Sequence, residues 1–252
     1  TLLHLIKYKG ENIRMAQLDK TYCEGWVQYL AHAKTIGTDV PMRGEHHEKD
    51  LAKGTARLYF NTFVTVLNEA VREGIIPKNP TKLLKKEERK MLSKQESKRC
   101  CLSIEEIKLL MVTPCKADTV KCAFLFACFC GLRLSDVRSL RWADIGKGTE
   151  GYYISKQMVK SRHVVTIPLS ENALAWMPAR GQARVEDKVF SLPSYFSVNY
   201  RMKQWAREAG IEKPVTFHTS RHTFATTLLT MGVDLYTTSK LLGHQNITTT
   251  QV

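Results

Sequence analysis

Four residues that lie far apart in the sequence, Arg133, His218, Arg221 and His244, are of types that can hold a phosphodiester. A guanidinium is a planar fork that matches two phosphate oxygens. His218 and Arg221 are three residues apart at the start of an expected helix, so their side chains share one face at its positive end, where phosphate binds well. Together these residues predict a site that binds one phosphodiester while its phosphorus is attacked.

Each of these residues, taken alone, also has an ordinary structural interpretation. Arg133 either pairs with Asp136 or is oriented by it toward a ligand, and the sequence leaves both open. His244 follows Leu-Leu-Gly in an expected tight turn, where a histidine is often a surface residue. Lys160 lies on an expected β-turn within reach of a ligand over a sheet, although a lysine there is usually just solvated. Only the combination points to chemistry.

The first hundred residues are expected to be helical. Thr55 is a candidate N-cap for a helix whose apolar residues recur at three- and four-residue spacing and which ends before Gly74. An earlier helix is expected over residues 17–34, and a loop over residues 37–50. Residues 82–99 are polar and basic. Such a run is usually a solvated face, but its position between two expected units favours an interdomain linker that lies along their ligand.

The remaining residues predict a second unit that carries all of the candidate site. Ser103 and Glu106 form a capping box at the start of its first helix. The nearly all-apolar run 121–130 predicts a buried central helix that ends at Gly131. Short β segments between residues 151 and 169 are followed by expected helices near residues 198–209, 220–231 and 236–242. The predicted fold class is therefore mainly α with a small β-sheet.

The charge of the chain indicates a polyanionic partner. Lysine and arginine number 38 against 24 acidic residues, which gives a net charge of +14, shared equally between residues 1–100 and 101–252. A basic surface is typical of nucleic-acid binding, because each neutralised phosphate releases counterions. The equal split favours two lobes that grip one polyanion over a basic tail on a neutral enzyme.

Other features of the composition exclude several classes of protein. The seven cysteines are odd in number and contain no Cys-x-x-Cys pair, so neither a disulfide framework nor a zinc site is favoured, and reduced thiols in a cytoplasmic protein are expected. No apolar run is long enough to span a bilayer, and no signal peptide is present. The chain opens on Thr1 without a methionine, and we expect it to be part of a longer protein.

The joint pattern of motifs resembles the tyrosine recombinases of the phage-integrase family. The pattern consists of Gly-Leu-Arg133-Leu-Ser-Asp, Lys160 eight residues before the proline of Ile-Pro-Leu, His218-x-x-Arg221-His and Leu-Gly-His244. The order and spacing match throughout residues 101–252. The stretch from Lys53 to Pro80 is similar to the family's helical core-binding domain.

The resemblance implies a role for each site residue. Arg133 and Arg221 would clamp the non-bridging oxygens of the pentacovalent transition state, and His244 would add a hydrogen bond. Lys160, in preference to Lys156, would protonate the departing 5′ oxygen, and His218 would assist proton transfer with the nucleophile. Asp136 and His222 would orient these groups. Two guanidiniums supply the charge stabilisation that other phosphoryl-transfer enzymes take from magnesium, so neither a metal nor another cofactor is expected.

The resemblance also implies the architecture and the partners. We expect two domains that form a C-shaped clamp on double-stranded DNA. Residues 1–97 would form a helical, SAM-like core-binding domain, with a basic linker that starts at about residue 82. Residues 101–252 would form a mixed α/β catalytic domain. The protein would be bacterial and cytoplasmic. It would act on DNA as a homo-oligomer, from dimer to tetramer, and would not bind a membrane. The residues assigned to DNA contact are Lys53, Thr55, Arg57, Lys85, Lys86, Lys98, Arg99 and Arg162.

One departure from the family pattern concerns the nucleophile. In the family a tyrosine attacks phosphorus, forms a 3′-phosphotyrosyl bond and follows the last histidine by about nine residues. That position is 253, one past Val252, and Tyr236 precedes His244 instead. We therefore expect a site-specific recombinase, an integrase of a mobile element, whose nucleophile is absent from residues 1–252. The alternatives are an invertase or resolvase of the same family, a type IB topoisomerase, and a non-catalytic DNA-binding protein if no tyrosine is encoded at 253.

Overall fold

The computed structural model describes residues 1–36, 49–92, 100–244 and 246–250, and it divides the chain into two compact units, Thr1–Ser97 and Lys98–Val252. Each unit has a hydrophobic core of its own. Within the described residues, no helix is both long enough and apolar enough to cross a membrane.

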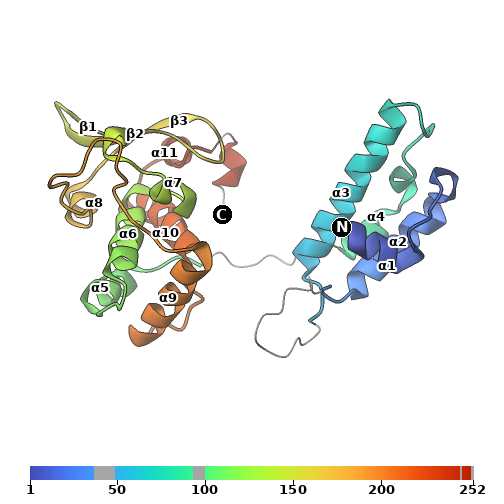
Figure 1. The fold of residues 1–252 in the computed structure, drawn as a ribbon, viewed down its shortest axis with the longest axis horizontal. Coiled ribbons are helices and arrows are strands. Elements are labelled where there is room, and N and C mark those ends of the chain that lie inside the picture. The colour runs from blue at the N-terminus through green and yellow to red at the C-terminus, as the bar shows by residue number, and fades with distance from the viewer. Residues whose placement is uncertain (37–48, 93–99, 245, 251–252) are drawn as a thin grey trace. The chain divides into compact units, whose positions relative to one another are not determined.

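Unit 1 is helical, as predicted (Figure 1). Its elements are α1 (Leu2–Lys9), the 3-10 helix η1 (Met15–Gln17), α2 (Lys20–His32), α3 (Lys53–Arg72), the 3-10 helix η2 (Pro80–Leu83) and α4 (Lys86–Lys90). The core lies between α2 and α3, where Trp26, Leu30 and Leu67 are almost fully buried. Asp19 caps α2, because its carboxylate accepts a hydrogen bond from the Tyr22 N–H at 2.7 Å.

Three expectations for unit 1 change. Thr55 is not the N-cap of α3. The N-cap is Ala52, the helix begins at Lys53, and Thr55 lies in its first turn. The prediction that a linker starts at about residue 82 is wrong for residues 82–92. Two short helices form there, and Leu84 and Leu92 are buried in the core. The helix expected over 17–34 is the shorter α2. Most of the loop expected over 37–50 lies outside the described residues.

Unit 2 is built around one buried helix. Its helices are α5 (Ile104–Val112), α6 (Asp118–Cys130), α7 (Leu134–Arg138), α8 (Glu171–Ala175), α9 (Tyr195–Glu208), α10 (Phe217–Thr230) and α11 (Leu235–Leu241), with the 3-10 helices η3 (Trp142–Asp144) and η4 (Ile247–Thr249). Helix α6 packs against α8, α9 and α10 (Figure 1), and most of its side chains are buried, as its apolar sequence predicts. The predicted capping box is present at α5, where Ser103 and Glu106 exchange hydrogen bonds.

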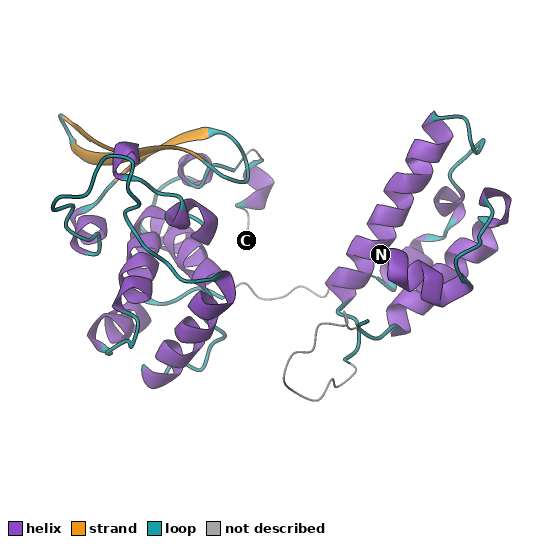
Figure 2. Ribbon diagram, viewed as in Figure 1, coloured by secondary structure: helices purple, strands orange, loops and turns teal. Residues whose placement is uncertain are grey.

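A three-stranded antiparallel sheet covers one side of unit 2 (Figure 2). Its strands β1 (Ile145–Gly148), β2 (Gly151–Gln157) and β3 (Val164–Pro168) pair in the order β1-β2-β3. Ile154 lies at the centre of the register, opposite Ile145 on one side and Ile167 on the other. Only β2 and β3 were predicted, because the Gly-Lys-Gly sequence of β1 has no strand pattern. Strand β3 contacts α11, which brings the β2–β3 turn toward the C-terminal helices.

Gly131 ends α6 in the left-handed conformation, at φ +70°, and has no space for a side chain. A Cβ at this position would lie 2.4 Å from a ring carbon of Phe224. Gly210 has nearly the same φ, +71°, but a Cβ there would meet nothing within 4 Å. The two glycines therefore separate the cost of the backbone conformation from the cost of the close packing.

We predict that Gly131→Ala lowers the free energy of unfolding more than Gly210→Ala does. The conformational penalty of about 1 kcal/mol applies to both variants. Overpacking against Phe224 adds roughly 1 to 3 kcal/mol to the first alone. Urea unfolding followed by tryptophan fluorescence measures both. An equal decrease in the free energy of unfolding in the two variants would show that the residues around Gly131 can accommodate a methyl group without destabilising the fold.

Candidate active site

Arg221 is the most deeply buried of the residues predicted to act on the phosphate. It lies one turn into α10, and its side chain is almost fully buried. Its Nη1 donates a hydrogen bond to the Gly131 carbonyl at 2.7 Å, and its Nη2 donates to the Leu242 carbonyl. The guanidinium thereby joins α10 to the end of α6 and to the end of α11. Burial and the nearby Arg133 charge lower the pKa of Arg221 to about 9, which leaves it positively charged at neutral pH.

Arg133 and Asp136 lie at the two ends of a loose ion pair. Arg133 is the N-cap of α7, and its Nη1 is 3.9 Å from Oδ2 of the fully buried Asp136. This distance is too long for a hydrogen bond, and Arg133 Nη1 has no hydrogen-bond partner in the described part of the chain. The other Asp136 oxygen, Oδ1, accepts a hydrogen bond from the Val159 N–H at 2.8 Å. Asp136 therefore lies between Arg133 and the β2–β3 turn.

The two candidate lysines occupy different environments. Lys156 lies on β2, where its Nζ donates to the Ser139 carbonyl at 2.9 Å and to Asp144 Oδ2 at 2.8 Å. Its ammonium is thus committed to a structural ion pair. Lys160 is exposed on the β2–β3 turn, next to Val159, whose N–H is held by Asp136. The geometry leaves Lys160 available to a ligand and Lys156 unavailable.

The three histidines lie on or next to the C-terminal helices. His218 is the second residue of α10, and its ring meets the ring of His222 edge to face, with 4.7 Å between centroids. His244 follows α11, and its N–H donates to the Ser239 carbonyl at 3.0 Å. Its ring Nδ1 is 2.8 Å from the hydroxyl of the buried Thr250. Gly243, at φ +63°, forms the turn between α11 and His244.

The pKa of His218 shows that several of these charges act at one place. Partial removal of its ring from water, together with the ring of His222 and the charges of Arg221, Arg133 and Lys160, lowers its pKa from 6.5 to about 4. Electrostatic interactions weaken with distance. The fold therefore brings Arg133 and Lys160, which are 85 and 58 positions before His218 in the sequence, close to its ring, and keeps His218 neutral at pH 7.

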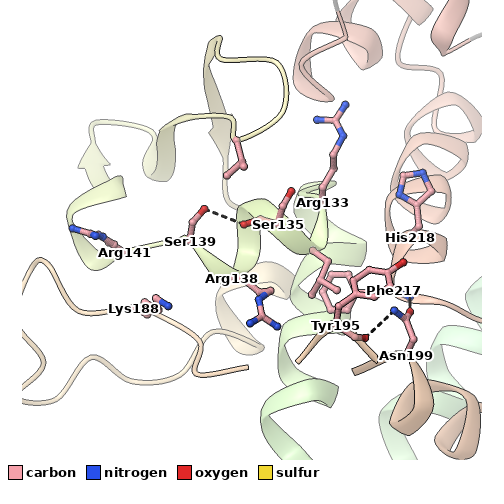
Figure 3. A pocket seen from close by; sticks show the side chains of 12 residues that line it. Arg133, Ser135, Arg138, Ser139, Arg141, Lys188, Tyr195, Asn199, Phe217 and His218 are labelled. Atoms are coloured by element: carbon pink, nitrogen blue, oxygen red, sulfur yellow. Dashed lines mark hydrogen bonds between the residues drawn. The ribbon is translucent and has the colours of Figure 1, made fainter. Parts of the chain in front are cut away.

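Arg133 and His218 line a groove of about 630 Å³ that extends beyond the predicted site (Figure 3). Three further basic residues line it, Arg138, Arg141 and Lys188, and none of the residues that line it is acidic. Sequence reasoning missed these three residues. Arg138 follows Arg133 on α7 and could have been noticed, whereas Lys188 joins the groove through an isolated β-bridge to Arg141 that has no sequence signature.

Unit 1 has a basic pocket of its own, of about 420 Å³. It contains two of the predicted DNA contacts, Arg57 on α3 and Lys86 on α4. It also contains three basic residues that were not singled out, Lys82, Arg89 and Lys90. Arg89 is anchored by a hydrogen bond to the Thr81 carbonyl at 3.0 Å. No acidic side chain lines this pocket.

The other predicted DNA contacts are more scattered. Lys53 and Thr55 lie in the first turn of α3, and Lys85 is the N-cap of α4. Arg162 is in the β2–β3 turn, at φ 61°, two residues after Lys160. Lys98 and Arg99 lie outside the described residues. Among the described residues, no group of three or more histidine, cysteine, aspartate or glutamate side chains is arranged to hold a metal ion.

Models of two protein families match the chain. Residues 101–252 match the phage integrase family, and residues 1–89 match the phage integrase SAM-like domain. Among curated proteins, the tyrosine recombinase XerD of Listeria monocytogenes serotype 4b (strain F2365) is 32% identical over 142 residues, which cover 48% of this chain and 45% of the relative. The tyrosine recombinase XerC of Shewanella sp. (strain ANA-3) is 26% identical over 220 residues, 82% of this chain and 71% of the relative. The chain thus spans about half the length of the first of these relatives.

Solved structures have the same fold along almost the whole chain. A lambda integrase dimer bound to a COC′ core site gives a TM-score of 0.71 at 17% identity, covering 99% of this chain and 84% of that one. The Tn1549 transposon integrase in complex with circular intermediate DNA gives 0.69 at 18% identity, covering 99% and 85%. At these identities, the likeness establishes the fold, which is mainly helical with a small antiparallel sheet, as predicted.

We predict that the imidazole of His218 titrates near pH 4, well below the usual value of 6.5. Because its pKa is lower in the folded chain than in the unfolded chain, the unfolded chain binds more protons between these values. The free energy of unfolding should therefore fall as the pH is lowered from about 6.5 to 4. An NMR titration measures the midpoint, and the spectrum of His218→Gln identifies the signal. Adding a short DNA duplex should raise the midpoint, because phosphate offsets the nearby positive charges. A midpoint at or above 6.5 would contradict the positive cluster.

Proposed function

Because the chain belongs to the phage integrase family, we propose that it forms the DNA-holding and catalytic part of a site-specific recombinase, the integrase of a mobile element. The enzyme would cut and rejoin DNA strands through a 3′-phosphotyrosyl intermediate. The observation that supports this proposal best is that the charges of Arg133, Lys160 and Arg221 act on a neutral His218, and that Arg133 and His218 line a groove without acidic lining. Such a site attracts a phosphodiester and stabilises added negative charge on it.

In this proposal the two arginines hold the phosphate. Arg221 uses one hydrogen of each terminal nitrogen on backbone carbonyls, so its remaining N–H groups are available to the non-bridging oxygens. Arg133 offers its fork from the opposite segment, the N-terminus of α7. Both charges are in place before the reaction, so the pentacovalent transition state is stabilised without reorganisation of the site.

Proton transfer would be divided between Lys160 and His218. Lys160, a positively charged acid on an exposed turn, would protonate the 5′ oxygen as it leaves phosphorus. His218 is neutral at pH 7, so its ring can accept the proton of the attacking tyrosine hydroxyl. The tyrosine is expected nine residues after His244, and His244 would donate a hydrogen bond to the phosphate. Asp136 would orient Arg133 and the Lys160 turn, and His222 would orient His218.

DNA would also be held by unit 1. The basic pocket around Arg57 and Lys86 fits the backbone of a duplex, and Lys53, Thr55, Lys85 and Arg162 would add contacts near it or near the active site. The relatives in which this fold has been solved include integrases on DNA, one of them a dimer. We propose the same kind of partner here, with a dimer or tetramer on DNA. An invertase or resolvase would use the same site and remains the alternative.

We predict that the 252-residue chain binds duplex DNA with a steep salt dependence. Several phosphate contacts should weaken affinity by orders of magnitude between about 50 and 200 mM salt. Replacing Arg57 and Lys86 by glutamine should lower the slope of log affinity against log salt by about one for each residue. Lys7→Gln, which removes an exposed lysine outside the pocket, is the control. An unchanged slope in the double variant would remove unit 1's pocket from the interface.

We predict that DNA cleavage depends on a tyrosine at 253 and on Lys160. Duplexes are first selected from a random library by the 252-residue chain. A chain extended past Val252, with tyrosine at position 253, should then leave protein attached to the DNA 3′ end in EDTA, as seen on a denaturing gel. Residues 1–252 alone should bind these duplexes without cutting them. Adduct formation by the shorter chain would place the nucleophile elsewhere, and cleavage that requires magnesium would overturn the proposed reaction.

The same assay tests the role of Lys160. Lys160→Ala should lose most cleavage, by about 100-fold or more. The control Lys147→Ala, at another exposed lysine of the sheet, should not. Once the cut is mapped, sulfur replaces the 5′ oxygen of the scissile bond, which makes a leaving group that needs no proton. Cleavage by Lys160→Ala should then recover. Failure to recover would show that Lys160 does not act as the acid.

A further inference from the structure

Helix α9 exposes a group of aromatic side chains that the proposed reaction does not use. Tyr195, Phe196 and Tyr200 are 61%, 80% and 64% exposed. The opposite face of the same helix is buried in the core through Val198, Met202, Trp205 and Ala206. The core therefore accounts for one face of α9 only. Phe196 and Tyr200 lie one turn apart on the other face, and Tyr195 meets Phe196 at the start of the helix. Such a contiguous exposed group indicates an interaction surface, since single exposed apolar residues are common but contiguous groups are not.

This aromatic face begins at the edge of the active-site groove. Tyr195 and Asn199 line the groove together with His218, and Figure 3 shows the three at the same end of it. The Asn199 side chain holds α9 in place: its Oδ1 accepts a hydrogen bond from the Phe217 N–H at 3.1 Å, and its Nδ2 donates to the Tyr195 carbonyl at 3.1 Å. Phe217 is the first residue of α10, so the aromatic face is tied to the helix that carries His218 and Arg221.

The rings are held by their neighbours. Tyr195 and Phe196 meet edge to face, with 5.9 Å between ring centroids. The Tyr200 hydroxyl accepts a hydrogen bond from Gln204 Nε2 at 2.9 Å. Such contacts reduce the conformational entropy that the side chains would lose on binding. The surface is thus partly organised before a partner arrives.

The charge around the rings identifies the kind of partner. Helical spacing places Lys203 and Arg207 in line with Phe196 and Tyr200, and both are exposed. The only acidic residue of α9 is Glu208, at its last position. An apolar surface between basic residues and a basic groove is complementary to duplex DNA, whose major groove presents thymine methyl groups between two rows of phosphates.

We propose that the N-terminal half of α9 lies in the major groove beside the bound phosphate, and that Phe196, supported by Tyr195, recognises thymine through its 5-methyl group. An α-helix fits the width of this groove, and apolar contact with the thymine methyl is one of the ways in which proteins distinguish bases there. The inference rests on the proposed function, because it takes DNA as the ligand of the groove. It adds a specificity-determining residue to a site in which Arg133 and Arg221 are proposed to hold a phosphate, which carries no sequence information.

The test uses the 252-residue chain and a random duplex library as the probe. The chain and its Phe196→Ala variant each select DNA, and each thymine that the chain enriches is replaced in turn by deoxyuridine, which lacks only the methyl group. We expect at least one position at which deoxyuridine weakens binding by the chain about fourfold, the effect of one buried methyl. Phe196→Ala should bind the two duplexes equally. Tyr236→Ala, which removes an aromatic ring that is 61% exposed on α11, is the control and should keep the preference.

The outcomes separate this inference from the function on which it rests. If the chain binds DNA in a salt-dependent way but Phe196→Ala keeps the full preference for thymine, or no thymine matters, α9 does not recognise the methyl group and the inference fails alone. If Phe196→Ala instead changes only the oligomeric state without DNA, the face binds a second copy of the chain and the inference also fails. If the unmodified chain binds no duplex, both the inference and the proposed function fail.

Discussion

The buried guanidinium of Arg221 is the interaction on which the rest of the site depends. A charge in a protein interior is costly unless hydrogen bonds replace its lost water. Here the replacement comes from two carbonyls at the ends of helices, those of Gly131 after α6 and Leu242 after α11. The C-terminal ends of helices carry unsatisfied carbonyls and a partial negative charge, so the hydrogen bonds stabilise these helix ends as well as the guanidinium. One side chain thereby fixes the segments that lead into Arg133 and into His244.

A second buried group, Asp136, connects the sheet to this arrangement. It reaches the β2–β3 turn through the Val159 N–H and lies close to Arg133, so that the lysine of the turn and the arginine of α7 depend on one carboxylate. Near the same end of β2, Lys156 fixes the sheet by its ion pair with Asp144 in η3. The two lysines differ little in sequence context, yet one stabilises the sheet and the other remains at the tip of its turn. That difference comes from the tertiary position of Asp144.

Sequence alone predicted the parts of the fold that local patterns determine. The apolar run of α6, the glycine that ends it and the capping box of α5 involve residues within a few positions of each other, and all three are present. Residues 82–92 were misjudged, because two isolated leucines in a basic segment, Leu84 and Leu92, carry no periodic signal although both enter the core. Arg141 and Lys188 meet only through a bridge across 47 residues, and no local pattern could indicate that they share a groove with Arg133. The motif residues themselves were found only because their joint order matched a family.

The way in which the arginines are held also explains how the groove keeps its charge. Had carboxylates held Arg221, the pair would be neutral and would offer a phosphate little. Carbonyls satisfy the same donors without cancelling the charge. Among the described residues, Asp136 is the carboxylate that acts on Arg221. It stands 3.9 Å from Arg133 and uses its other oxygen on a backbone N–H. The positive charges of Arg133, Arg221 and Lys160 are therefore only partly compensated, and they add to the effect of burial in lowering the pKa of His218. The destabilisation of the empty site becomes binding energy for a phosphodiester, which grows as negative charge accumulates in the transition state.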